Sequence, residues 1–107
     1  MPLPLPTTFP VEQLHAAASP FKSEKDLPAC SANQAIAMVN IREEGRGTYR
    51  RFGDGYWLPK NGDTYSRHAK EVLRATDRTI LSLIRSGYLT VTDQLHGKPV
   101  RVTLTFP

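Results

Sequence analysis

The segment that most constrains the fold is residues 75–105, ATDRTILSLIRSGYLTVTDQLHGKPVRVTLT. Thr76 is of the type that caps a helix, and Gly87 is of the type that ends one in a left-handed conformation. Between them, four apolar residues form one stripe at helical spacing: Ile80, Leu81, Leu83 and Ile84. After Gly87 the period changes to two, which is the pattern of strands with one buried face. The segment therefore predicts a short helix joined directly to a β-hairpin.

Within the second strand of that hairpin, apolar and polar residues alternate: Val100, Val102, Leu104 and Phe106 against Arg101, Thr103 and Thr105. The connecting residues DQLHGKP contain a glycine and a proline and predict a projecting loop. A second hairpin is predicted at residues 47–58, where TYRRF and YWLP flank the turn sequence GDG.

Two further helices are predicted. CSANQAIAMVN predicts a core helix with Ser31 as its N-cap, and its expected buried side consists of Ala32, Ala35, Ile36 and Val39. YSRHAKEVLRA predicts a helix that Asp63 or Thr64 caps and that ends near Ala75. Its apolar side consists of Tyr65, Ala69, Val72 and Leu73. Because only one or two residues then precede the next helix, we expect the two helices to cross steeply.

The first 29 residues differ from the rest of the chain. Residues 1–10 contain four of the nine prolines and predict an extended arm, and residues 11–18 predict a short helix. We therefore predict two parts: a proline-rich arm with a short helix over residues 1–29, and a folded domain over residues 30–107.

Composition limits the class of protein. The single cysteine, Cys30, excludes an intrachain disulfide and a cysteine-rich zinc site. No apolar run reaches the roughly 18 to 20 residues of a membrane span, and MPLPLPTTFP lacks the features of a signal peptide. We expect a cytoplasmic protein with no membrane association.

Charge is unevenly distributed along the chain. Residues 1–45 carry three basic and five acidic side chains, whereas residues 46–107 carry eleven basic and five acidic ones. This asymmetry favours an anionic partner such as nucleic acid, bound by a surface of the second part.

The predicted order of elements is helix, hairpin, helix, tight turn, helix, strand, loop and strand. Over roughly residues 31–106 this order resembles the winged helix-turn-helix class. The most similar segment is TDRTILSLIRSGYLTVT, which resembles the capped recognition helix and first wing strand of small bacterial and phage regulators. The resemblance implies an α+β fold with a C-terminal β-hairpin wing and an additional hairpin between the first and second core helices. It also implies sequence-specific binding of duplex DNA by a homodimer, as a transcriptional regulator of a phage, prophage or plasmid.

Candidate DNA contacts follow from the exposed side of the helix after Thr76. Opposite its apolar stripe lie Arg78, Thr79, Ser82, Arg85 and Ser86. Arginine can pair with a guanine edge, and serine or threonine can bond to base edges or phosphate. Phosphate contacts are expected from the basic residues of the preceding helix and the wing: Arg67, Lys70, Arg74, His96, Lys98 and Arg101. In a competing interpretation, Arg78 forms an ion pair with Asp77 or Glu71 instead.

The alternative function is a protein-interaction module, for example a phage-encoded inhibitor or adaptor. It would bind a protein partner through the aromatic hairpin or the proline-rich arm. We expect no enzymatic activity, cofactor or metal. His15, His68 and His96 lie on separate predicted elements without the spacing of a metal motif, and Cys30 has no basic neighbour in the sequence.

Overall fold

The computed structural model describes residues 23–53 and 55–107. These residues form a small α+β domain with three α-helices and a five-stranded antiparallel sheet. The helices and strands are α2 (Ala32–Glu43), β1 (Thr48–Phe52), β2 (Tyr56–Leu58), α3 (Arg67–Leu73), β3 (Ala75–Thr76), α4 (Asp77–Ser86), β4 (Leu89–Leu95) and β5 (Lys98–Leu104). Two 3-10 turns are added at Glu24–Asp26 and Gly62–Thr64. No helix in this described part is long and apolar enough to cross a membrane.

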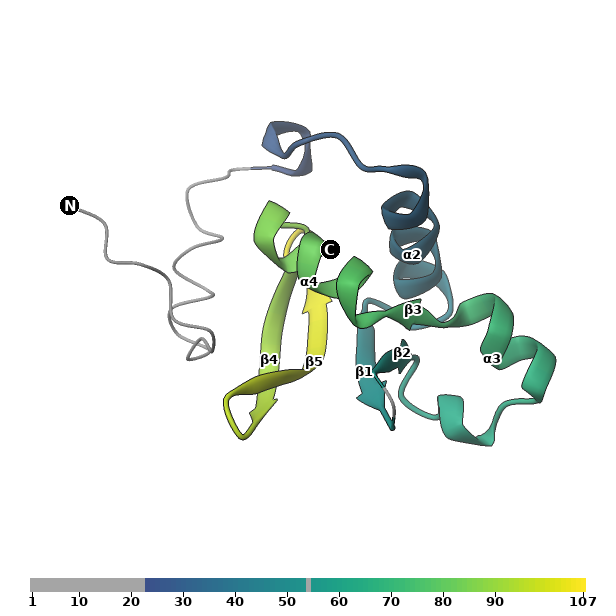
Figure 1. The fold of residues 1–107 in the computed structure, drawn as a ribbon. Coiled ribbons are helices and arrows are strands. Elements are labelled where there is room, and N and C mark those ends of the chain that lie inside the picture. Colours follow the sequence, from purple (N-terminus) through teal and green to yellow (C-terminus); the bar gives the residue numbers. More distant parts are fainter. Residues whose placement is uncertain (1–22, 54) are drawn as a thin grey trace.

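The strand order in the sheet is β3-β2-β1-β5-β4. Both predicted hairpins are present, β1–β2 between α2 and α3 and β4–β5 at the C-terminus. The two hairpins join where β1 pairs with β5, which places Tyr49 opposite Val102. Figure 1 shows the β4–β5 hairpin at one side of the domain and α3 at the other, with β1 and β2 between them.

One face of the sheet is covered by α2 and α4, which pack on each other and on the strands. The core between these two layers contains the fully buried side chains of Ile41, Tyr49, Trp57, Ile80, Leu83, Leu89, Val91 and Val102. The opposite face carries polar side chains on β1 and β5, whereas Leu58 of β2 is fully buried there against Gly62. On this face Thr90 of β4 bonds to Thr105, just after β5, at 2.7 Å. The domain therefore has two layers, and its outer sheet face is partly solvated.

The buried side of α2 differs from the predicted one. Ser31 caps the helix as expected, with its hydroxyl accepting from the amide of Gln34. The buried residues, however, are Ala37, Met38 and Ile41. The four residues predicted to be buried are all exposed: Ala32, Ala35, Ile36 and Val39. The prediction was wrong because α2 carries apolar residues on two sides, so spacing alone cannot select the one that faces the sheet.

The helix pair around residue 75 also differs from the prediction. Ser66, not Asp63 or Thr64, caps α3, and α3 ends at Leu73 with none of its residues buried. The two residues of β3 then pair with β2 before α4 begins. The connection is therefore anchored to the sheet edge, whereas a bare turn between two helices was expected.

The wing is more regular than predicted. Most of DQLHGKP belongs to strands, because β4 continues to Leu95 and β5 starts at Lys98. The turn is only His96 and Gly97, with φ angles of 51° and 75°. Two successive residues with positive φ match the twist of a two-residue hairpin turn.

The segment before residue 30 contacts the domain in its described part. Leu27 is buried, Arg42 forms an ion pair with Glu24 at 3.1 Å, and the Tyr88 hydroxyl donates to the carbonyl of Pro28 at 2.7 Å. The predicted proline-rich arm and the helix at residues 11–18 lie outside the described residues. The division at residue 29 stays a prediction.

Candidate nucleic-acid interface

The helix α4 has the two ends that the sequence predicts. The hydroxyl of Thr76 accepts from the amide of Thr79 at 3.3 Å, which satisfies one of the free N–H groups of the first turn. At the other end Gly87 has φ 93°, and its amide and that of Tyr88 close the last turn onto Ile84 and Leu83. A residue with a side chain would be strained in this conformation.

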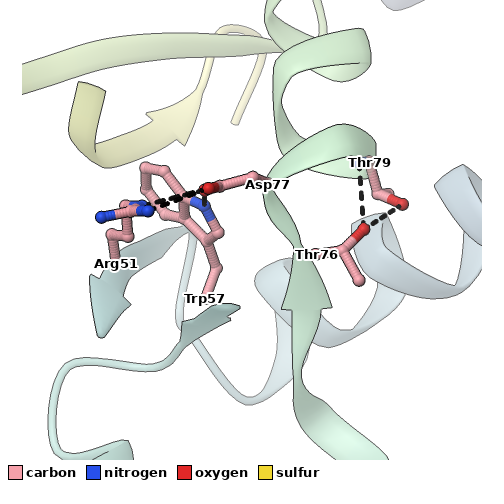
Figure 2. Close-up of polar contacts among 5 residues, drawn as sticks. All are labelled: Arg51, Trp57, Thr76, Asp77 and Thr79. Atoms are coloured by element: carbon pink, nitrogen blue, oxygen red, sulfur yellow. Dashed lines mark hydrogen bonds and ion pairs between the residues drawn. The ribbon is translucent and has the colours of Figure 1, made fainter. Parts of the chain in front are cut away.

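Three hydrogen-bonded side chains, those of Arg51, Trp57 and Asp77, attach the start of α4 to the sheet and are called the Asp77 lock below (Figure 2). Asp77, the first residue of α4, accepts from Arg51 of β1 at 3.0 Å and from the Trp57 indole N–H of β2 at 2.7 Å. Burial by itself raises the pKa of Asp77, but the hydrogen bonds from Arg51 and Trp57 and the charges of Arg51 and Lys98 outweigh it, so the pKa is lowered. The carboxylate thus joins two strands to one helix. Sequence reasoning did not find this lock, because its members are up to 26 residues apart.

Arg78 and Arg85 are both exposed and lie on the same side of α4, because seven residues are close to two helical turns. Neither forms an ion pair or side-chain hydrogen bond within residues 23–53 and 55–107. The competing interpretation of Arg78 is wrong on both partners: Asp77 pairs with Arg51, and Glu71 pairs with Arg67 at 3.7 Å. The two guanidinium groups are therefore available to an external ligand.

Thr79 and Ser82 lie at the side of α4 that meets α2. The Ser82 hydroxyl accepts from the side-chain amide of Gln34 at 2.9 Å and donates to the carbonyl of Thr79 at 2.8 Å. The Thr79 hydroxyl accepts from that of Thr76 at 3.2 Å. The Ser82 hydroxyl thus links α4 to α2, whereas the Thr79 hydroxyl bonds only within the start of α4. Ser86 is half-buried.

The basic residues of α3 form a separate group. Arg67 is almost fully exposed, Lys70 is half-buried, and Arg74 follows the end of the helix. Arg74 lines a shallow pocket of about 210 Å³ between α2 and α4, together with Thr76 and Thr79. Of the three, Arg74 is the residue that the structure places next to α4.

The wing residues divide between the two faces of the sheet. Lys98 lies near the start of α4, since its charge contributes to lowering the pKa of Asp77. His96 is exposed at the wing tip. Arg101 lies on the opposite face, because its neighbour Val102 is buried under the helices and adjacent strand residues point to opposite faces. The structure thus separates Arg101 from Arg78 and Arg85.

On that outer face Arg101 has a partner that sequence reasoning missed. Arg50 of β1 lies directly opposite Arg101 of β5, and both line an open groove that also includes Arg46 and Lys60. The sequence did contain a signal for Arg50. Successive side chains of a strand point to opposite faces, so the residue next to the buried Tyr49 must point outward.

No group of three or more histidine, cysteine, aspartate or glutamate side chains within the described residues could hold a metal ion. No protein-family model matches the chain, and neither does any curated protein or solved structure.

Proposed function

We propose that this domain binds duplex DNA as a winged helix-turn-helix protein, with α4 as the recognition helix and β4–β5 as the wing. The order α2, β1, α3, α4, β4 and β5, with β1 paired to β5, supports this assignment. The insertion of β2 and β3 and the shortness of α3 are departures from the simplest form of the class. Despite these departures, α4 is connected to the sheet at both ends, through β3 before it and β4 after it, and α2 packs along one side of it.

The observation that carries the proposal is the pair Arg78 and Arg85. Both extend from the solvent side of a helix that the Asp77 lock and the α2 contacts hold in position. A preorganised arginine can donate two hydrogen bonds to a guanine edge in the major groove. We assign base reading to these two residues, because the Ser82 hydroxyl already bonds to Gln34 and to the carbonyl of Thr79, and Thr79 lies at the side of α4 that meets α2.

Phosphate contacts come from residues that flank α4. We assign them to Lys98 and His96 of the wing and to Arg67, Lys70 and Arg74 of the α3 segment. Such contacts fix the position of the protein on the duplex and make its affinity depend on salt. A role as a transcriptional regulator of a phage, prophage or plasmid is part of the same proposal.

The test is fluorescence anisotropy with labelled duplexes selected from a random pool, measured over a range of salt concentrations. We expect Arg78→Ala and Arg85→Ala to weaken selected duplexes by about 1–3 kcal/mol each and to relax sequence preference. Lys98→Ala is expected to weaken all duplexes alike and to lower the salt slope by about one. Arg101→Ala is the matched control, because it removes the same charge from the opposite face of the sheet.

The proposal is wrong if duplex binding is undetectable at low salt. It is also wrong if Arg101→Ala weakens binding as much as Arg78→Ala and Arg85→Ala do, because the contact surface would then not be α4.

The exposed apolar side of α2 supports a homodimer. Ile36 and Val39 are 59% and 50% exposed, with Ala32 and Ala35 beside them. Antiparallel pairing of two copies of α2 would pack Ile36 on the Val39 of a second copy. It would also bring Glu43 next to the start of that copy's α2, where the first turn has no acidic residue. An acid is favourable at a helix start and unfavourable at a helix end, so the pairing is complementary in charge.

Sedimentation equilibrium without DNA tests this arrangement. We expect a weak dimer that Ile36→Lys converts to a monomer. The control is Leu95→Lys, which makes the same kind of change at a side chain that is 60% exposed on the wing. A wild-type monomer at all concentrations, or equal effects of the two variants, would contradict the assignment of α2.

The same apolar face is the observation that favours the alternative, a protein-interaction module. The aromatic hairpin gives it less support, because Trp57 and Tyr49 are buried in the core. A pull-down from nuclease-treated lysate separates the two functions. Loss of every partner after nuclease treatment supports DNA, and a protein that stays bound in stoichiometric amount supports the alternative.

A further inference from the structure

The outer face of the sheet carries a second cationic surface, independent of α4. An open groove of about 900 Å³ lies there, between the end of α2, the strands β1 and β5, and the segment that follows β2. Four cations line it: Arg46, Arg50, Lys60 and Arg101. Two carboxylates, those of Glu43 and Glu44, line it as well. The groove therefore has an excess of two positive charges and the volume of a small-molecule site.

The centre of the groove is the pair Arg50 and Arg101, which face each other directly across β1 and β5. Side chains at such positions start only about 5 Å apart, and like charges placed there destabilise a sheet. Neither arginine forms an ion pair within the part of the chain that the structure describes. The guanidinium group of Arg50 lies over the ring of Phe52, 5.0 Å from its centre, a contact that does not neutralise its charge. Asp93, the neighbour of Arg101 on β4, bonds instead to the backbone of Gln94. An anion between the two guanidinium groups would remove the repulsion.

The rim of the groove shows a second unfavourable feature. Arg46 has φ 51°, a left-handed conformation that residues with a side chain rarely adopt. The turn around it is fixed by backbone hydrogen bonds, including that from the Gly47 amide to the carbonyl of Ile41 at 2.8 Å. The turn places a third guanidinium group at the groove beside the Arg50 and Arg101 pair.

The carboxylates and an aromatic ring narrow the class of ligand. A continuous nucleic-acid strand would bring further phosphates against Glu43 and Glu44. A small molecule needs only one phosphate on the arginines and can direct hydroxyl or amino donors to the two carboxylates. Tyr65 also lines the groove and offers a ring for stacking. A phosphate monoester carries a charge close to −2 at neutral pH, which matches the charge excess of the groove.

We propose that this groove binds a nucleoside monophosphate, with its phosphate held between Arg50 and Arg101. The proposal does not depend on DNA binding by α4, because the two surfaces lie on opposite faces of the domain. Its sequence position grouped Arg101 with the DNA contacts around α4. The groove proposal assigns Arg101 to the nucleoside monophosphate instead.

Isothermal titration calorimetry of the full chain tests the proposal with six probes: adenosine and guanosine monophosphate, the two nucleosides without phosphate, inorganic phosphate, and a short single-stranded oligonucleotide. We expect at least one monophosphate to bind saturably, inorganic phosphate to bind more weakly, and the nucleosides not to bind. Arg50→Gln combined with Arg101→Gln is expected to weaken the monophosphate about tenfold or more, because it removes both charge-assisted contacts. Arg85→Gln, the control on the other face, should leave the affinity unchanged.

Absence of saturable binding of either monophosphate up to about 10 mM overturns the proposal. So does an unchanged affinity in the double variant, provided that its thermal unfolding shows it to be folded. Tighter binding of the oligonucleotide than of the monophosphates, lost in the double variant, would identify a single-strand site and overturn the mononucleotide class. Duplex DNA binding is measured on the same variants, so that failure of the groove proposal can be told apart from failure of the DNA proposal. Arg85→Gln should impair only duplex binding, and the double variant should impair only monophosphate binding.

Discussion

Replacement of Asp77 by alanine tests the lock that positions α4. Three contributions are lost. The ion pair with Arg51 is about one-third exposed on each side, so after solvent screening it contributes only about 0.5 kcal/mol. The indole N–H of Trp57, a residue that is 1% exposed, loses its acceptor, and an unsatisfied buried donor costs about 1–3 kcal/mol. The favourable charge at the start of α4 contributes a further ~0.3–1 kcal/mol.

Asp77→Ala is therefore expected to lower the free energy of unfolding by about 2–4 kcal/mol. Asp77→Asn keeps an acceptor for the indole and should lower it by only about 1 kcal/mol. Asp63→Ala is the control for removal of an exposed acidic residue that starts no α-helix. Urea unfolding followed by tryptophan fluorescence is the assay, because Trp57 is the only tryptophan and reports on the lock itself.

The pH dependence provides an independent check. The pKa of Asp77 is lower in the folded state than its usual value of about 3.9, so its contribution to stability is complete above that value. The contribution is lost as the pH falls through the folded pKa. Asp77→Asn should therefore lose less stability than the wild type below about pH 4. If Asp77→Ala unfolds at the same urea concentration as Asp63→Ala, or if the acid limb of Asp77→Asn equals that of the wild type, the lock does not stabilise the domain.

Four further changes have expected effects on stability. Thr76→Val removes the N-cap of α4 and should lower the free energy of unfolding by about 1 kcal/mol, which thermal circular dichroism can measure. Gly87→Ala places a side chain at φ 93°, and a loss of about 1–2 kcal/mol in urea unfolding is expected; no loss would contradict a left-handed helix end. His96→Asn relieves positive φ at the wing tip and should raise the melting temperature by a few degrees, with a stabilisation of about 0.5 kcal/mol. Tyr49→Phe removes the 2.6 Å hydrogen bond from its hydroxyl to the carbonyl of Leu73, so hydrogen exchange should become faster in α3, and unchanged exchange would show that α3 does not depend on this bond.

Elements with a local signal at each end were predicted well. A capping threonine and a glycine enclose α4, and alternating residues define β4 and β5, so neighbouring residues carry the information. The hairpin β1–β2 was found in the same way, from a glycine-rich turn between aromatic segments. These predictions required no knowledge of contacts between distant residues.

Local signals failed where a choice depended on a distant partner. Apolar residues lie on two sides of α2, and only the position of the sheet decides that Met38 is buried and Ile36 exposed. The two-residue strand β3 exists because β2 offers an edge for it, which no pattern in Ala75 and Thr76 reveals. Such pairings join residues far apart in the chain, and single-sequence periodicity does not report them.

In the candidate site, too, some features follow from local sequence and others only from contacts between distant residues. The amino-acid sequence by itself determined that Arg78 and Arg85 share one side of a helix, because helical geometry relates residues seven positions apart. Only the tertiary structure decided that Asp77 pairs with Arg51, so that neither Arg78 nor Arg85 has an ion-pair partner among the described residues. It also decided that Arg101 joins Arg50 on the other face of the sheet. The physical reason is that side-chain direction along one element follows from the backbone period, whereas the partners and the shared surfaces follow from how separate elements pack.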